Sequence, residues 1–185
     1  MTDTEIIDLF FERSDQAIDE TAKAHGGPVR KVAYNILGNI QDTEECVNDT
    51  WFAAWNSIPP HRPSVLRTFL CKIARNLATK RYHSNTALKR NSQYDLALDE
   101  LAECIPDGSC VEGSYMAKEL ATAIDGFLDT LSYEDRFIFM RRYWYADSLG
   151  DIALMMKLSN NAVSVRLHRT KNKLKSSLKK GGFLA

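Results

Sequence analysis

The sequence has no long hydrophobic run. No apolar stretch in its 185 residues approaches the roughly 18 to 20 residues that a membrane-spanning helix needs. The N-terminal segment MTDTEIIDLFFERSD carries acidic side chains early and lacks the basic stretch followed by an apolar one that marks a secretion signal. From these two absences we expect a cytoplasmic protein that does not insert into a membrane.

Cysteine and histidine are scarce and scattered. The chain has 4 cysteines and 4 histidines, and Cys104 and Cys110 lack the spacing and the neighbouring histidine of a zinc site. The sequence also lacks a P-loop, a G-x-S-x-G turn and an H-E-x-x-H helix. We therefore expect reduced thiols, no metal site, no cofactor and no catalytic residue, so the chain is predicted not to be an enzyme.

Strand-like alternation is nearly absent, and helical periodicity dominates. Apolar side chains at residues 6–11 begin a helix that we expect to fade at the glycines and proline of residues 26–28, with a short helix at 29–37 behind them. Asp42 is the expected N-cap of the next helix, which the prolines of residues 59–63 end. A fourth helix follows.

Residues 86–113 lose this periodicity and become polar and then acidic, as expected of a linker. Beyond them, Ser132 and Ser148 are expected to begin two helices, and a break at Leu158 and Ser159 precedes the last one. The predicted fold class is all-α. Two small helical domains, residues 1–87 and 114–180, are joined by an acidic linker at 88–113.

Charge is segregated along a chain whose formal net charge is zero. Residues 51–94 contain basic side chains and no acidic one, whereas residues 95–135 contain a single lysine among many acids. Residues 136–185 are again strongly basic, and residues 1–50 are acidic. Charge runs are often only solvated surfaces, but two basic blocks free of interleaved acids favour two polyanion-binding surfaces.

The last two predicted helices have the pattern of a helix-turn-helix, in which the second helix enters the major groove of DNA. Its apolar face, with Val163, Leu167 and Leu174, is expected to pack on Ile152, Ala153 and Leu158. The opposite face carries polar and basic side chains. A membrane-surface or partner-binding helix is the alternative interpretation of the same cationic, amphipathic segment.

Two stretches resemble a known family. AYNILGNIQDTEECVNDTWFAAWNSIPP, followed by FLCKIARNLATKRY, resembles region two of bacterial RNA polymerase sigma factors of the extracytoplasmic-function (ECF) group in the sigma-70 family. LSYEDRFIFMRRYWYADSLGDIALMMKLSNNAVSVRLHRTKNKL resembles region four of the same group. The two stretches occur in the family's order and cover most of the chain.

The resemblance assigns roles to residues of the first domain, at 1–87. It implies docking on core RNA polymerase through Glu45, Asn48 and Asp49, an acidic and amide-bearing face suited to a basic partner. It also implies recognition and melting of the minus-10 element, where cationic side chains follow the DNA backbone. The residues matched to that role are His61, Arg62, Lys72, Arg75, Asn76, Lys80 and Arg81.

In the second domain, at 114–180, the resemblance implies recognition of the minus-35 element. The matching residues are Asn160, Asn161, Ser164, Val165, Arg166, His168, Arg169 and Lys171, with Arg166 and Lys171 suited to phosphate. Lys80, Ala162, Ser164 and Val165 depart from the family's common pattern. For that reason the sequence does not name the promoter.

The expected function is that of a sigma factor subunit, which binds core RNA polymerase and directs promoter-specific transcription initiation. Its expected partners are core RNA polymerase, promoter DNA and an anti-sigma factor, with the chain monomeric when free or bound one to one to that factor. Two alternatives from other classes stay open. One is a stand-alone helix-turn-helix DNA-binding regulator, and the other is a helical adaptor whose basic tail binds a membrane or an acidic protein.

Overall fold

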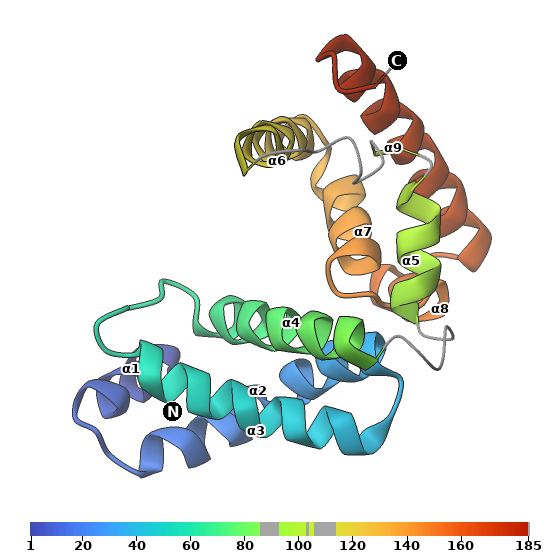
Figure 1. Cartoon of the computed structure of the whole chain (residues 1–185). Coiled ribbons are helices and arrows are strands. Elements are labelled where there is room, and N and C mark those ends of the chain that lie inside the picture. The colour runs from blue at the N-terminus through green and yellow to red at the C-terminus, as the bar shows by residue number, and fades with distance from the viewer. Residues whose placement is uncertain (86–92, 103, 106–113, 185) are drawn as a thin grey trace. The chain divides into compact units, whose positions relative to one another are not determined.

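The computed structural model describes residues 1–85, 93–102, 104–105 and 114–184. These residues form nine helices and no strand, which confirms the predicted all-α fold class (Figure 1). The chain divides into two compact units, Met1–Ser92 and Gln93–Ala185. Among the described residues, no helix is both long enough and apolar enough to cross a membrane.

The first unit contains the helices α1 (Asp3–Phe11), α2 (Gln16–Leu37), α3 (Ile40–Ser57) and α4 (Leu66–Asn85). Helices α2, α3 and α4 each pack against the other two, and α1 packs on α2. Their core is apolar, and Phe10, Ile36, Ile58, Leu66 and Leu70 are all fully buried within it. The long helices α3 and α4, which carry the residues assigned to polymerase and minus-10 DNA, are therefore held on a shared core.

Helix α2 runs without a break through residues 26–28, so the predicted end of a helix there is wrong. Pro28 lies inside the helix and has no N–H group to donate to the preceding turn. The buried residues Thr21, His25 and Val29 are four apart and continue one stripe across the proline. Packing of α2 on α3 and α4 outweighs the roughly 3 kcal/mol that proline costs a helix interior.

The chain breaks earlier than predicted, between α1 and α2. Arg13 has a φ of 55°, which turns the backbone after Phe11. Its Nη1 donates to the carbonyl oxygen of Trp55 at 2.7 Å, and its guanidinium lies 5.2 Å from the centroid of the Trp55 ring. This contact with α3, which the sequence pattern does not reveal, accompanies the turn.

The N-cap of α3 is Asn39 rather than the predicted Asp42. The Asn39 side chain accepts a hydrogen bond from the backbone N–H of Asp42 at 2.8 Å. Its Nδ2 donates back to Asp42 Oδ2 at 2.6 Å. Asn39 is a preferred N-cap residue, and it lets α3 begin at Ile40 before the expected position. The predicted end of this helix at the prolines is confirmed, because α3 ends at Ser57.

The second unit contains the helices α5 (Gln93–Ala102), α6 (Ser114–Asp129), α7 (Tyr133–Tyr143), α8 (Leu149–Met156) and α9 (Asn160–Lys180). A single hydrophobic cluster joins α5, α6, α7, α8 and α9. The predicted caps are confirmed at α7 and α8, where the Ser132 and Ser148 side chains accept hydrogen bonds from the N–H groups of Asp135 and Asp151.

Helix α5 lies in the stretch that the sequence analysis expected to be a connector. Tyr94 and Ala97 are buried, and both belong to a helix that packs on α7. Within the predicted linker at 88–113, Gln93–Ala102 thus form a helical component of the second unit.

Candidate nucleic-acid and polymerase interfaces

The helix-turn-helix is formed by α8, a turn at residues 157–159, and α9. Ser159 is the N-cap of α9 and accepts a hydrogen bond from the backbone N–H of Ala162 at 3.2 Å, as the predicted break requires. Lys157 has a φ of 56° and ends α8 in the left-handed conformation that often closes a helix. The turn is therefore short and fixed at both ends by hydrogen bonds.

The inward face of α9 holds it on α8 and α7. Val163, Leu167 and Leu174 are buried in one cluster with Ile152 and Ala153 of α8. This packing confirms the predicted apolar face. Since a helix that is buried along one side must present its other side to solvent, the opposite residues of α9 are left for a partner.

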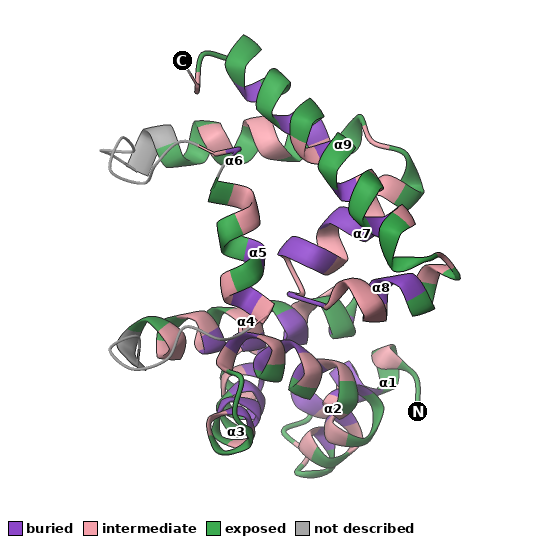
Figure 2. Cartoon of the chain, turned by 90° about the vertical axis from the view of Figure 1, so that its right-hand side faces the viewer, coloured by how far each residue is buried: buried purple, intermediate pink, exposed green. Residues whose placement is uncertain are grey.

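The outward face of α9 carries most of the residues assigned to the minus-35 element. Figure 2 shows exposed segments along α9 interrupted by buried positions. The exposed residues that recur at spacings of three and four are Asn160, Asn161, Ser164, Val165, His168 and Arg169. They occupy about 14 Å of the helix axis, a length comparable to the major groove width of about 12 Å. Such a face can reach base edges.

Two of the assigned residues, Arg166 and Lys171, instead contact other residues of the second unit. Arg166 Nη1 lies 2.6 Å from Glu134 Oε2 and 3.3 Å from Asp135 Oδ1, at the start of α7. The hydrogen bond to Glu134 raises the pKa of the Arg166 guanidinium. Lys171 is half-buried, and its Nζ donates to the carbonyl oxygen of Glu100 at 3.1 Å. Both cations that were assigned to phosphate are thus engaged within the second unit.

A buried cation on α7 was missed by the sequence analysis. The Arg142 side chain is 3% exposed and faces Glu100 of α5. Its Nε donates to Glu100 Oε2 at 3.2 Å and its Nη2 donates to Glu100 Oε1 at 2.7 Å. Its Nη1 donates to Gln93 Oε1 at 3.2 Å and to the Asp147 carbonyl oxygen at 2.9 Å. A buried guanidinium needs such partners, so Arg142 ties α5 to the helix-turn-helix unit.

The neighbouring Tyr143 joins the same network. Its Oη donates to Glu100 Oε2 at 3.1 Å, and burial together with the Glu100 charge raises the pKa of this phenol. A sequence signal for this contact exists: Tyr94, Ala97 and Leu101 are three and four residues apart, as on one face of a helix. Because this segment is short and rich in acidic residues, its helical spacing was not taken as a predicted helix.

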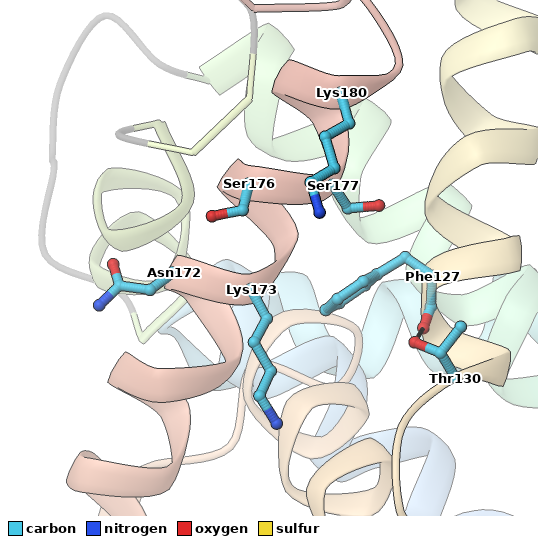
Figure 3. A pocket seen from close by; sticks show the side chains of 7 residues that line it. All are labelled: Phe127, Thr130, Asn172, Lys173, Ser176, Ser177 and Lys180. Carbon is cyan, nitrogen blue, oxygen red and sulfur yellow. Dashed lines mark hydrogen bonds between the residues drawn. The ribbon is translucent and has the colours of Figure 1, made fainter.

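A groove with a volume of about 480 Å³ lies beside the C-terminal half of α9 (Figure 3). Phe127 and Thr130 line one wall, and the α9 wall consists of Asn172, Lys173, Ser176, Ser177 and Lys180. The lysines are exposed. This wall has the polar and cationic chemistry of a phosphate-facing surface, whereas the residues assigned to base edges lie nearer the N-terminus of α9.

In the first unit, the residues assigned to polymerase lie together on α3. Glu45, Asn48 and Asp49 are all exposed. Arg81 of α4 faces this surface: it pairs closely with Glu45, and its Nη2 lies 3.1 Å from Asp49 Oδ2. Its Nη1 is 3.9 Å from Asp42. The hydrogen bond to Glu45 raises the pKa of Arg81. Arg81, which was assigned to DNA, therefore bridges α4 to the acidic face of α3.

The other residues assigned to minus-10 DNA follow α4 and the loop before it. Lys72, Asn76 and Lys80 are exposed at intervals of four, so they share one side of the helix. Arg75 is half-buried and has interaction partners. In the loop, His61 and Arg62 are exposed.

The loop cation Arg62 also contacts α1. Its Nη2 lies 2.5 Å from Asp8 Oδ1, and its guanidinium is 5.2 Å from the centroid of the Phe11 ring. The part of the assigned DNA surface with exposed side chains therefore includes Lys72, Asn76, Lys80 and His61, while Arg62 and Arg81 also hold helices together.

Comparison with known proteins finds similarity to sigma factors. The family model described as Sigma-70 region 2 matches residues 21–87. The ECF RNA polymerase sigma factor SigE of Mycolicibacterium smegmatis is 24% identical over 177 residues, covering 93% of this chain and 67% of that protein.

A solved structure, that of CnrH in complex with the cytosolic domain of CnrY, is 21% identical with a TM-score of 0.45, covering 96% of this chain and 97% of that one. The family match lies on the unit with the acidic α3 face and the basic α4, where the sequence resemblance had placed region two. The similarity is thus to sigma-70 region 2 over residues 21–87 and to an ECF RNA polymerase sigma factor over most of the chain.

Proposed function

We propose that this chain is a sigma factor subunit that binds core RNA polymerase and directs promoter-specific, DNA-templated transcription initiation. The observation that carries the proposal is the presence on one chain of sigma-70 region 2 and of a helix-turn-helix whose second helix has an exposed polar and basic face. The first feature is found in sigma subunits of RNA polymerase, and the second is a DNA-binding motif.

The proposed division of labour follows the predicted domains. Residues 1–87 bind core polymerase and recognise and melt the minus-10 element, and residues 114–180 read the minus-35 element, with residues 88–113 between them. Glu45, Asn48 and Asp49 are the proposed polymerase contacts, because an exposed acidic face suits a basic partner surface. The exposed residues of α9 between Asn160 and Arg169 are the proposed base-reading set.

Catalysis of RNA synthesis belongs to the polymerase in this proposal, and the chain is a non-enzymatic specificity subunit that acts in the cytoplasm. An anti-sigma factor is a further proposed partner, because sigma factors of this group are commonly held inactive in that way. We propose a monomer when the chain is free and a one-to-one complex with that factor.

Run-off transcription with core bacterial polymerase and a library of genomic DNA fragments tests the proposal. The wild-type chain is expected to give discrete transcripts, and the pair Glu45→Gln and Asp49→Asn is expected to weaken both polymerase binding and transcription. Glu12→Gln, which removes an exposed acid from the end of α1, is the matched control. A folded chain that does not bind core polymerase defeats the proposal.

A second experiment, duplex DNA binding by the purified chain, separates the proposal from a stand-alone DNA-binding regulator. Tight, sequence-specific binding of the purified chain to duplex DNA without polymerase would favour that alternative. The sigma factor proposal expects weak binding by the free chain, with an affinity that falls steeply as salt rises.

A further inference from the structure

Phe52 is a large aromatic side chain that α3 presents to solvent. The residue is 69% exposed, although Trp51 beside it and Ala54 two positions later are buried in the core of the first unit. Burial of an aromatic side chain is strongly favourable, and the fold uses only a small part of that stabilisation at Phe52. Most of the Phe52 surface is therefore available to a partner.

The position of Phe52 on α3 places it within the face proposed to bind polymerase. Phe52 follows Asp49 by three residues, Asn48 by four and Glu45 by seven, so these four exposed residues form one side of the helix, the α3 face. With 3.6 residues per turn, Phe52 projects between Asn48 on one side and Glu45 and Asp49 on the other. A single exposed apolar residue is common on protein surfaces, but one at the centre of a polar face has the arrangement of an interface hot spot.

The charged groups beside Phe52 are mostly acidic. The carboxylates of Asp42, Glu45 and Asp49 pair with one guanidinium, that of Arg81, so three negative charges meet one positive charge. The Glu45 and Asp49 side chains are still 58% and 54% exposed. They can therefore accept hydrogen bonds from a second cation while the contacts of Arg81 stay in place. A partner that covers the α3 face needs basic side chains.

The same charges disfavour the other ligands that pack on an exposed phenylalanine. Nucleobases stack on aromatic side chains, but they bring phosphates, which the carboxylates of Glu45 and Asp49 repel. Anionic lipid headgroups are repelled in the same way. A second copy of the chain that presented its own α3 face would place acid against acid. A protein surface with positive charge beside an apolar recess satisfies both parts of the face.

We propose that Phe52 is the hot spot of the α3 face and inserts into an apolar recess on core RNA polymerase that is flanked by Arg or Lys side chains. The inference rests on the proposed function in taking core polymerase as the partner. It goes beyond that function by naming an apolar contact and the chemistry of the opposing surface. Glu45 and Asp49 then act mainly on orientation and on the rate of association, whereas Phe52 sets how long the complex lasts.

Equilibrium binding of the full chain to core bacterial polymerase, without DNA and at low and high salt, tests the inference. Phe52→Ala is expected to weaken binding about 30-fold at both salt concentrations, the effect of removing a hot spot. Phe52→Leu is expected to lose less, because it keeps an apolar side chain. The loss caused by Glu45→Gln with Asp49→Asn should shrink at high salt, because salt screens exposed charges.

Ile40→Ala is the matched control for these variants. Ile40 is 72% exposed and also lies on α3, but it is twelve residues before Phe52 and thus about 120° away around the helix. This variant should bind polymerase as the wild type does. Because Phe52 is exposed, Phe52→Ala should fold like the wild type by circular dichroism. Phe52→Gln, with a polar side chain in the same place, guards against misfolding of Phe52→Ala and should weaken binding as strongly.

The failure of this inference and the failure of the proposed function give different results. If the wild-type chain binds polymerase and the folded Phe52 variants bind equally well, the inference alone is overturned. A wild-type chain that does not bind polymerase overturns the proposed function and the inference together. The inference is also overturned if Phe52→Ala loses affinity for a single-stranded oligonucleotide but not for polymerase, which would identify a nucleobase as the occupant, or if it disperses a dimer of the wild-type chain without losing polymerase.

Discussion

Removal of the Glu100 carboxylate should open helix α5 and leave the rest of the second unit folded. Glu100→Ala deletes the acceptors of three hydrogen bonds, from Arg142 Nε at 3.2 Å, from Arg142 Nη2 at 2.7 Å and from Tyr143 Oη at 3.1 Å. Hydrogen bonds to charged groups contribute about 1.5 to 3 kcal/mol each. The Glu100 side chain is 33% exposed, so water recovers part of this. We expect a loss of about 2 kcal/mol for the set.

Native-state amide hydrogen exchange measures this opening directly, because it reports the free energy of local unfolding segment by segment. A loss of about 2 kcal/mol corresponds to an increase of about 30-fold in the exchange rate of α5 amides. Amides of α3 and α4 in the first unit are expected to be unaffected. Asp99→Ala, which removes an exposed acid from the same helix, is the matched control and should leave α5 protected.

Arg142→Met tests the same Glu100–Arg142 contact by the exchange rate of α5 amides. It replaces a buried cation by an apolar side chain of similar length, and such replacements cost less than leaving one charge buried without its partner. The increase in α5 exchange should therefore be smaller than in Glu100→Ala. Unchanged α5 exchange in Glu100→Ala would refute the reasoning, because it would mean that packing at Tyr94 and Ala97 alone holds the helix.

Three further predictions concern single residues. Lys173→Gln, which removes an exposed cation from the phosphate-facing wall of α9, should lower the salt slope of duplex DNA binding by about 0.9. Arg166→Gln, whose cation pairs with α7, should leave the slope unchanged, and equal effects of the two would contradict the assignment. Asn39→Ala should destabilise the start of α3 by about 1 kcal/mol in hydrogen exchange, with Gln41→Ala as the silent control. Burial raises the pKa of the Cys46 thiol to about 11, so the unfolded chain loses this proton first and stability should fall between about pH 9 and 11. Urea unfolding at each pH checks this, and the decrease should be smaller in Cys46→Ala.

The helical fold and the helix-turn-helix could be predicted because local signals carry them. Ser132, Ser148 and Ser159 are side-chain caps whose hydrogen bonds form within four residues of sequence. The inward stripe of α9 follows from a spacing of three and four residues. Such features depend on near neighbours alone, and a single sequence contains them.

The features that the sequence did not predict depend on residues far apart in the chain. Pro28 is tolerated in α2 because that helix is packed against α3 and α4. Arg142 and Glu100 are 42 residues apart, and Arg81 and Glu45 are 36 apart. The sequence pattern around a charged residue does not distinguish whether its partner is DNA, a polymerase or another helix of the same chain. The site assignments to DNA and polymerase accordingly stay predictions, and Arg166, Lys171 and Arg81 have partners within the chain.

The docking of α5 also shortens the stretch of chain that joins the two units. With α5 held on the second unit, only residues 86–92 join Asn85 at the end of α4 to Gln93, and a chain of that length spans at most roughly 30 Å. At about 3.4 Å per base pair this corresponds to roughly nine base pairs. Release of α5 would place the whole stretch from Asn85 to Ser114 between the units, so the docked helix raises the effective concentration of one unit beside the other. In the proposed function, in which both units bind one promoter, the Glu100–Arg142 contact thereby sets the length of the tether between the units and, with it, the range of promoter spacings that the chain can bridge.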